Sequence, residues 1–303
     1  MKTFRRSLPV SLAVLLAACN ILLVMQVSAQ PRRATPAPVP DAVVMPRPSD
    51  AQITQAQATL QRFLSGLQGS DKAIFDNYPW LVEITPREIN TAIIPDLSPR
   101  FEAKHQSNLE VARAGDIDVL FMGDSITDWW RNETGNYAGK PVFDRYFANM
   151  KVANFGIAGD TTQGVLYRLQ NGEGQGFSPK AVMLMIGTNN TRTNLAGEIA
   201  EGIGAVVLQL QQNFPDANIL LLGIFPRSTA DSPLRPQIAE INSIISRLHD
   251  GEQVHYLDIG EIFLDEQGNI PATIMSDGLH PTTAGYQLWA DAIIEPLTAL
   301  MQD

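Results

Sequence analysis

The stretch IDVLFMGDSITDWW, residues 117–130, places a polar Gly-Asp-Ser triplet directly after an apolar run. The run at 117–122 has the length and the apolar side chains of a buried strand. Because Gly, Asp and Ser all favour turns, a simple strand-to-helix turn is one interpretation of residues 123–125. The other is a nucleophilic Ser125 at the end of the strand, which requires the rest of a catalytic apparatus elsewhere in the chain.

Strands and helices alternate along the remainder of the chain. Four more apolar runs of strand length follow, at residues 152–155, 182–186, 219–224 and 254–259. Helix-length stretches lie between most of the runs and after the last, among them 196–213, 236–248 and 282–301. This alternation predicts an α/β fold with a parallel five-stranded sheet that helices cover on both faces. In such folds the chemistry gathers at the carboxyl ends of the strands.

Small and polar residues follow the second and third predicted strands. After the second comes NFGIAGDTT (154–162), in which Gly159 lets the backbone approach a ligand and offers its N–H. After the third comes GTNNT (187–191), in which Asn189 can turn the chain or direct its amide into the cleft as an oxyanion donor. Taken singly, each stretch is explained by an ordinary loop, and for the Gly159 stretch alone the loop is the favoured interpretation.

The late stretch SDGLHP (276–281) supplies an acid and a base. Asp277 and His280 are three residues apart, so the carboxylate can bond to one imidazole nitrogen and leave the other free for Ser125. Of the other three histidines, His105 and His249 sit in helical patterns and His255 lies within a predicted strand, and we assign them to packing or to the surface. A nucleophile, a glycine N–H, an asparagine amide and an Asp/His pair thus occur together, which favours catalysis over four unrelated turns.

Composition excludes several other classes of function. The 303 residues hold 32 acidic and 22 basic side chains, a formal net charge of −10. Such a surface repels phosphate backbones, so we expect no nucleic-acid partner. No histidine, cysteine or carboxylate spacing matches a metal site, and no cofactor is predicted.

The N-terminus resembles an export signal. Residues 1–29 begin with a basic segment, continue with an apolar stretch and end in Val-Ser-Ala, so we expect cleavage after Ala29 and a secreted or periplasmic protein. The sequence LAAC, ending at Cys19, also fits a bacterial lipobox, and lipidation there or an uncleaved signal would anchor the chain to a membrane. The apolar run continues past Cys19, which favours cleavage after Ala29.

Three segments complete the predicted organisation. Residues 30–49 are rich in proline and alanine and predict an extended linker. Residues 50–108 predict a helix up to about residue 67 and then an irregular segment that wraps onto the main domain. The catalytic domain is expected at 109–303.

The combined blocks resemble those of the SGNH (GDSL) hydrolase family. Gly-Asp-Ser at 123–125, Gly159, Gly-Thr-Asn at 187–189 and Asp277-x-x-His280 correspond to its four blocks. Within that family, two stretches are similar to the catalytic subunit of intracellular platelet-activating-factor acetylhydrolase and its bacterial relatives: NFGIAGDTTQGVLYRLQNGE (154–173) and LLGIFPRSTADSPLR (221–235). Thr127 stands where a G-x-S-x-G elbow would have its second glycine, so the ordinary α/β-hydrolase fold is not indicated. Asn190 stands where many members have Asp.

The resemblance implies a flavodoxin-like α/β/α sandwich and metal-independent ester hydrolysis. It implies Ser125 as nucleophile, His280 as base, Asp277 as its orienting acid, and an oxyanion hole from the Ser125 and Gly159 N–H groups and the Asn189 amide. The acyl group is expected to be short, acetyl above all. Export favours acetylated glycans as substrate, with lysophospholipids or other lipid esters as the alternative. A non-catalytic glycan-binding protein of the cell envelope is the competing class.

Overall fold

A computed structural model describes residues 34–82 and 89–302 of the chain. The predicted signal, its Cys19 and its cleavage site at Ala29 lie outside these residues. A five-stranded sheet forms the centre, with strand order β2-β1-β3-β4-β5 and every neighbouring pair parallel. Its strands are β1 (Val119–Gly123), β2 (Val152–Asn154), β3 (Ala181–Met185), β4 (Asn218–Leu222) and β5 (Val254–Leu257).

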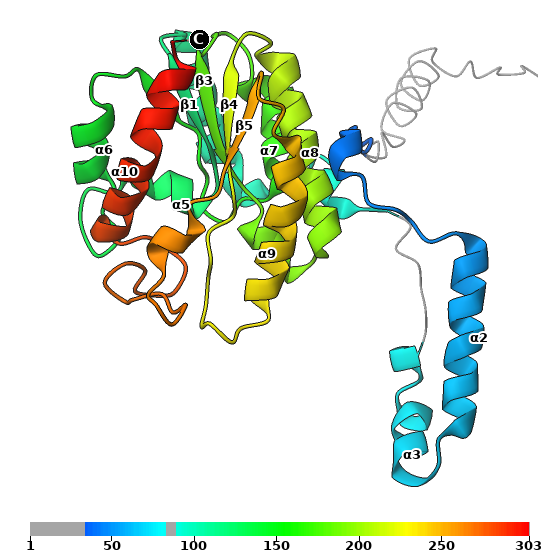
Figure 1. The fold of residues 1–303 in the computed structure, drawn as a ribbon. Helices are drawn as coiled ribbons and strands as arrows, with labels where there is room; N and C mark the ends of the chain where they lie inside the picture. The colour runs from blue at the N-terminus through cyan, green and yellow to red at the C-terminus, as the bar shows by residue number, and fades with distance from the viewer. Residues whose placement is uncertain (1–33, 83–88, 303) are drawn as a thin grey trace, which may run out of the picture. The chain divides into compact units, whose positions relative to one another are not determined.

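Helices cover both faces of the sheet, as the alternating pattern predicts. Figure 1 shows α6 and α10 on one face and α7, α8 and α9 on the other. The helices that follow the N-terminal segment are α4 (Glu102–Ala114), α5 (Ser125–Asp128), α6 (Lys140–Phe147), α7 (Thr162–Arg168), α8 (Ala196–Asn213), α9 (Leu234–Ile245) and α10 (Thr283–Leu300). The three layers and the strand order are those of the flavodoxin-like sandwich.

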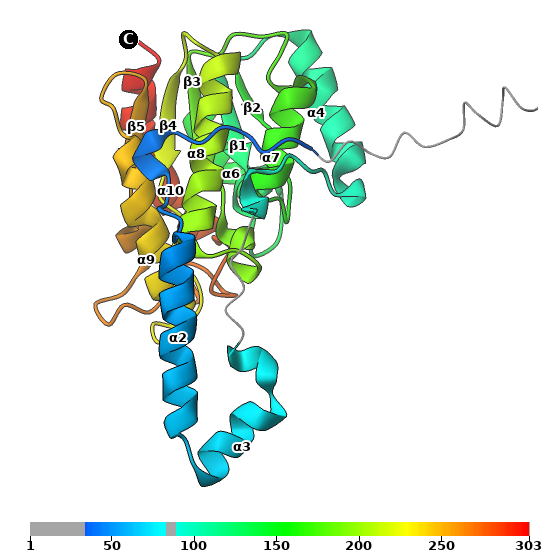
Figure 2. The same cartoon turned by 90° about the vertical axis from the view of Figure 1, so that its right-hand side faces the viewer.

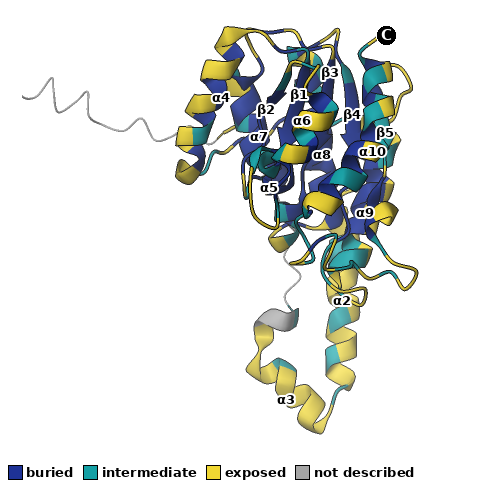
Figure 3. Cartoon of the chain, turned by 90° about the vertical axis from the view of Figure 1, so that its left-hand side faces the viewer, coloured by how far each residue is buried: buried dark blue, intermediate teal, exposed yellow. Residues whose placement is uncertain are grey.

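Two apolar cores, one on each face, hold the layers together. Successive side chains of a strand point to opposite faces, so Leu120 of β1 packs under α7 and α8, whereas Phe121 packs towards α6 and α10. All five residues of β1 are buried, and so are all five of β3. Figure 3 shows the inner strands almost wholly buried, whereas the edge strands β2 and β5 are partly exposed and the helices keep exposed outer faces. Burial on both faces explains why the strands read as continuous apolar runs.

The predicted elements agree with the observed ones to within a few residues. The five predicted strands are confirmed, and α8 has the predicted bounds. Helix α9 starts two residues earlier than expected, and a 3-10 turn, η8 (Ser246–Leu248), continues it to the predicted end. Apart from the helical pattern noted at His105, helix α4 was not predicted as an element, and it crosses the expected domain boundary at 108/109.

The proline- and alanine-rich segment is more than a linker. Apart from η1 (Asp41–Val43) it lacks regular structure from residue 34 to residue 49, but its Ala37 and Val43 are buried in the core that contains α8. Met45 N donates to the Glu201 carboxylate of α8 at 3.0 Å. This extended stretch therefore packs along α8, beside which Figure 2 shows it.

Residues 50–82 form a helical segment. Helix α2 (Asp50–Gly66) matches the predicted helix and starts with a capping box between Ser49 and Gln52. A second helix, α3 (Gly69–Asn77), was not predicted, and the Phe63 and Phe75 rings of the two helices meet edge to face. No helix in the described parts of the chain is long and apolar enough to cross a bilayer.

The stretch that starts at residue 89 docks on the main domain. Asn90 is buried and donates through Nδ2 to Glu198 O at 2.9 Å and to the Glu201 carboxylate at 2.8 Å, both on α8. Its Oδ1 accepts from Ala92 N and starts η3 (Thr91–Ile93). This stretch also reaches α7, where Thr162 Oγ1 donates to Ala92 O at 2.7 Å.

Candidate active site

Ser125 lies at a tight turn between β1 and α5. Asp124 caps the helix, because its Oδ1 accepts from Ile126 N at 3.0 Å. Ser125 is the first helical residue, 6% exposed, and its N–H has no intrahelical partner. A side chain at Gly123 would come within 2.5 Å of Met185 O, so only glycine allows β1 to pass this close to β3. The turn therefore presents the serine at the carboxyl edge of the sheet.

Asp277 and His280 form a local unit on the loop before α10. Asp277 Oδ2 is 2.6 Å from His280 Nδ1, and its Oδ1 accepts from the backbone N–H groups of Leu279 and His280. Gly278 has φ 66°, the left-handed conformation that lets the loop turn back on itself. Partial burial acts to raise the pKa of Asp277, but the hydrogen bonds from His280 outweigh it and hold that pKa below its usual value. The carboxylate is thus kept ionised beside the ring.

The structure brings Ser125 and His280 together across 155 residues of sequence. Ser125 Oγ is 2.9 Å from His280 Nε2. Since Nδ1 bonds to an ionised carboxylate, it carries the ring proton, and Nε2 is left to accept from the serine hydroxyl. This arrangement can draw a proton from Ser125 as its oxygen attacks an electrophile.

Three hydrogen-bond donors lie on the loops around the serine. Gly159 has φ 86°, and within the described residues neither its N–H nor that of Ser125 has a protein acceptor. The Asn189 amide donates one hydrogen to Asp160 O at 2.9 Å, which fixes its orientation next to Gly159 and leaves its other N–H available. All five residues predicted for the site therefore lie at the carboxyl edge of the sheet, Ser125 and Asn189 in short helices and the others on loops.

The loop that carries Gly159 is tied to the turn that carries Ser125. Asn154 Nδ2 donates to Thr127 O at 2.7 Å, and Ala158 N donates to Asp128 Oδ2 at 3.1 Å. Arg131 bonds Asp128 and also donates to Gly156 O at 2.6 Å. These bonds fix the distance between the two backbone donors, which preorganises them for a developing negative charge.

Asn190 has a different environment from its neighbour Asn189. It is fully buried, and its side chain accepts from Thr162 N at 3.1 Å and donates to Gln163 Oε1 at 2.8 Å. These bonds join η7 (Thr188–Arg192) to the start of α7. Asn190 thus shapes the loop, and an amide serves this purpose as well as a carboxylate because it both donates and accepts.

A buried ionic cluster lies behind the Gly159 loop. Arg168 of α7 pairs with Asp160 at 2.8 Å and also with Glu173, and all three side chains are fully buried. His105 Nδ1 of α4 is 2.7 Å from Glu173 Oε1. Because Asp160 O also accepts from Asn189, the cluster supports the residue that orients the amide donor.

Two aromatic side chains that sequence reasoning missed lie against His280. The Trp129 ring stacks on the imidazole, with centroids 4.0 Å apart, and the Tyr137 ring lies 5.2 Å from Trp129. Tyr137 OH accepts from Ser276 Oγ at 3.1 Å. The only sequence signal was the pair of tryptophans that directly follows the serine turn, in TDWW.

Asp124, which directly precedes the serine, has a strongly raised pKa. Burial raises its pKa from 3.8 to about 7, opposed in part by the Ile126 N–H, and its Oδ2 is buried without a partner. A folded-state pKa above the unfolded value means that the native protein holds this proton more tightly. Stability is therefore lost as the pH rises from about 4 to about 7.

We expect Asp124→Asn to remove this pH dependence. Asparagine keeps the N-cap acceptor but cannot ionise, so the free energy of unfolding should shift in favour of the variant by up to about 4 kcal/mol between pH 4 and pH 8. Denaturant unfolding at both pH values measures the shift, with the exposed Asp216→Asn as matched control. A difference from the parent that stays constant with pH would show that Asp124 does not titrate in this range.

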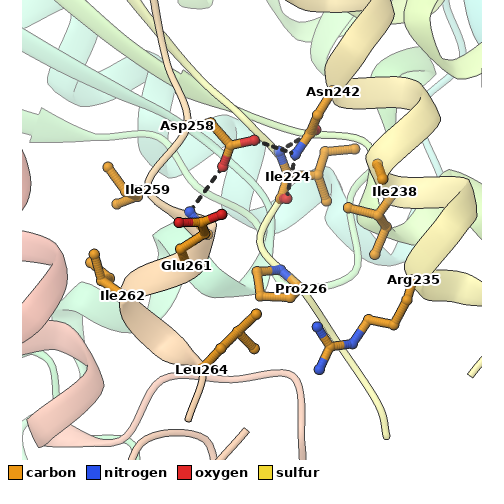
Figure 4. Close-up of a pocket in the computed structure, with 12 residues that line it drawn as sticks. Ile224, Pro226, Arg235, Ile238, Asn242, Asp258, Ile259, Glu261, Ile262 and Leu264 are labelled. Carbon is orange, nitrogen blue, oxygen red and sulfur yellow. Dashed lines mark hydrogen bonds between the residues drawn. The ribbon is translucent and has the colours of Figure 1, made fainter. Parts of the chain in front are cut away.

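A separate cavity of about 500 Å³ lies at the carboxyl ends of β4 and β5. Its walls are mainly apolar and its polar groups include Arg235, Asn242, Asp258 and Glu261, as Figure 4 shows. Asn242 Nδ2 donates to Asp258 Oδ2 at 3.0 Å. None of the triad residues lines this cavity, so it is distinct from the serine site.

Comparison with known families identifies one match. The sequence model of the GDSL-like Lipase/Acylhydrolase family matches residues 121–288. This range begins within β1 and ends in α10, and it contains Ser125, Gly159, Asn189, Asp277 and His280.

Curated relatives share a third of their residues with this chain. Human platelet-activating factor acetylhydrolase IB subunit alpha2 is 33% identical over 205 residues, which cover 67% of this chain and 86% of the relative. The Drosophila melanogaster subunit beta homolog is 34% identical over 211 residues, 69% of this chain and 88% of the relative.

Solved structures show the same fold. A candidate platelet activating factor from Streptococcus pneumonia superposes with a TM-score of 0.54 at 21% identity, covering 65% of this chain and 92% of that chain. A candidate acylhydrolase from Bacteroides fragilis gives 0.53 at 21% identity, covering 66% and 96%. At these identities the likeness concerns the fold alone.

Proposed function

The chain belongs to the GDSL-like lipase/acylhydrolase family and is a carboxylic ester hydrolase, and we propose that it removes short acyl groups through a Ser125–His280–Asp277 triad. The observation that carries the triad is the continuous pair of contacts, Ser125 Oγ to His280 Nε2 at 2.9 Å and His280 Nδ1 to Asp277 Oδ2 at 2.6 Å. The hydrogen bonds within each loop do not by themselves require Ser125 to contact His280.

The reaction proceeds by two acyl transfers. His280 accepts the Ser125 proton as Oγ attacks the ester carbonyl, and Asp277 stabilises the imidazolium that forms. The carbonyl oxygen becomes an oxyanion facing the N–H groups of Ser125 and Gly159 and the Asn189 amide. His280 then protonates the departing alcohol, and water repeats the sequence on the acyl-enzyme to release the acid.

The acyl group is proposed to be acetyl, and the alcohol half a glycan. The name acetylhydrolase of the curated relatives supports the acyl group. The export signal predicted in residues 1–29 favours acetylated glycans outside the cytoplasm, with lysophospholipids or other lipid esters as the second candidate.

Hydrolysis of 4-nitrophenyl esters of increasing chain length tests this function. We expect the acetyl ester to give the highest kcat/KM and the dodecanoyl ester the lowest.

A serine-directed organophosphonate should label Ser125 alone, as mass spectrometry of the digested protein can show. Release of acetate from an acetylated oligosaccharide, compared with release of fatty acid from a lysophospholipid, separates the two substrate classes. Labelling at another serine would contradict the assignment, and binding of the oligosaccharide without turnover would favour the non-catalytic alternative.

Asn189 and Asn190 form a matched pair for testing the oxyanion hole. Removing an oxyanion donor typically lowers kcat by about 10²–10³-fold, so we expect that loss for Asn189→Ala with little change in KM. Asn190→Ala removes loop bonds instead, and should lower the melting temperature while kcat stays within about threefold. Steady-state kinetics and thermal unfolding of both variants measure the difference. An Asn189→Ala enzyme with a lowered melting temperature and a normal kcat would mean that only backbone N–H groups form the oxyanion hole.

A further inference from the structure

Arg227 lies between the two loops that complete the site. It follows β4, and its Nη1 donates to Thr188 O and Oγ1 at 3.3 and 3.2 Å. Thr188 directly precedes Asn189. On the other side, Ser228 N donates to Gly278 O at 2.7 Å, within the loop of Asp277 and His280. The segment Arg227–Ser228 is therefore bonded both to the loop of Asn189, through Arg227, and to the loop of His280, through Ser228.

The backbone at this point is held in an unusual conformation. Ser228 has φ 62° and is the one non-glycine residue with positive φ among those that the structure describes. Such conformations persist only where surrounding contacts enforce them, and they are concentrated at functional sites. Two hydrogen bonds hold Ser228: its N–H donates to Gly278 O, and its carbonyl oxygen accepts from Arg235 Nη2 at 3.5 Å.

The Arg227 guanidinium does not use all of its hydrogen-bond donors within the protein. Of its five N–H donors, those of Nη1 meet Thr188, whereas Nε is buried without any partner. Arg192, at the exposed end of η7, adds a second positive charge nearby. Within residues 34–82 and 89–302, neither guanidinium pairs with a carboxylate, although the chain as a whole has an excess of acids. An arginine that pairs with no carboxylate, on a loop bonded to the loops of Asn189 and His280, is suited to an anion supplied by the substrate.

The charges around Arg227 are those of the active site. Burial lowers the pKa of Arg227, and the charge of Arg192 lowers it further, whereas the carboxylates of Asp124 and Asp277 act in the opposite direction. The guanidinium is thus within electrostatic range of residues on both sides of Ser125.

We propose that Arg227, assisted by Arg192, binds an anionic group, a carboxylate or a phosphate, located close to the ester bond of the substrate. The inference rests on the proposed function, because it assumes hydrolysis at Ser125. It narrows the substrate class to short-chain esters that carry a negative charge in either the acyl or the alcohol half.

Two matched pairs of esters test the proposal. In the first pair the charge lies in the alcohol half: 3-acetoxybenzoate against its neutral methyl ester. In the second it lies in the acyl half: 4-nitrophenyl hydrogen succinate against 4-nitrophenyl methyl succinate. We expect the parent enzyme to prefer the anionic member of one pair by about 10- to 100-fold in kcat/KM, the range of a charge-assisted hydrogen bond. The pair that shows the preference identifies the half that carries the charge.

Variants of Arg227 and of an exposed arginine elsewhere separate binding from structure. Arg227→Gln should abolish the preference ratio and Arg227→Lys should retain part of it. Arg145→Gln, on the exposed side of α6, should keep the parent ratio. A purely structural Arg227 would lower both members of a pair equally and leave the ratio unchanged, which would overturn the proposal. So would a parent enzyme without preference in either pair. If 4-nitrophenyl acetate itself is not hydrolysed, the proposed function fails first, so the two failures are distinguishable.

Discussion

Replacing Ser125 by alanine is expected to lower kcat for 4-nitrophenyl acetate by about 10⁴- to 10⁶-fold. The hydroxyl is the group that forms the acyl-enzyme, and the variant keeps only the oxyanion donors and the binding surface. Because Ser125 is buried and small, the change removes one oxygen and should leave the melting temperature within a few degrees of the parent. Single-turnover kinetics, which also show the burst of nitrophenol from an acyl-enzyme, provide the measurement.

The control for this loss is a serine on the loop of the base. Ser276→Ala removes the hydrogen bond to Tyr137 OH but no part of the triad, so kcat should change by a few-fold at most. His280→Ala should be about as slow as Ser125→Ala, and the double variant no slower than either, because the members of a triad act as a unit. Independent, multiplicative losses in the double variant would mean that Ser125 and His280 serve separate steps.

The site could be predicted because its parts are encoded locally. The serine turn, the Gly159 loop and the Asp277/His280 pair each occupy fewer than ten residues, and each directly follows a buried strand or precedes a helix. In a parallel sheet the carboxyl ends of the strands share an edge, so predicting the strands was enough to bring these loops together. The strands were predictable because burial on both faces leaves an uninterrupted apolar run.

Helix α4 was missed because its buried face is half polar. The residues that it buries are His105, Asn108, Leu109 and Ala112, so the apolar spacing that indicates an amphipathic helix is absent. The polar pair is buried because both side chains bond to Glu173, 65 or more residues away. No local pattern contains that contact.

The packing of the proline-rich segment depends on glycines elsewhere. A side chain at Gly204 of α8 would come within 2.5 Å of Val43, and one at Gly197 within 2.6 Å of Met45. The two glycines leave space along α8 that this segment fills. Composition alone predicts an extended chain, which it is, but cannot show that a helix 150 residues later has room for it. The contacts of Trp129 and Arg227 with the active-site loops were missed for the same reason.

Replacing Arg168 by methionine is expected to destabilise the fold by about 3–5 kcal/mol. The guanidinium lies between two fully buried carboxylates, Asp160 and Glu173, and also donates to Phe155 O at 3.0 Å. Burial acts to raise the pKa of Asp160, and the positive charge of Arg168 opposes it. Methionine fills much of the volume but removes the guanidinium from both carboxyl groups. Asp160 must then remain an unpaired buried ion or take up a proton, and Glu173 keeps only its contacts with His105 and Asn108. Denaturant unfolding at pH 7 measures the loss.

A matched set of variants distinguishes charge from packing. Arg168→Met combined with Asp160→Asn and Glu173→Gln removes all three charges, and should be more stable than Arg168→Met alone because no buried ion is left unpaired. Arg145→Met, an exposed arginine on α6, should change stability by less than about 0.5 kcal/mol. If the triple variant is no more stable than the single one, the loss comes from packing around the arginine.

The same cluster gives Arg168→Met a second expected effect, on turnover. Asp160 holds the Arg168 guanidinium through its side chain and the Asn189 amide through its backbone carbonyl. A side chain at Gly164 would come within 1.9 Å of Asp160 Oδ1, so the carboxylate is confined on its other side as well. Loss of the arginine should therefore let the loop at Asp160 shift and misalign the amide, lowering kcat per folded molecule while KM changes little. Normal kcat in the folded fraction would show that the buried ions stabilise the fold without positioning the oxyanion donors.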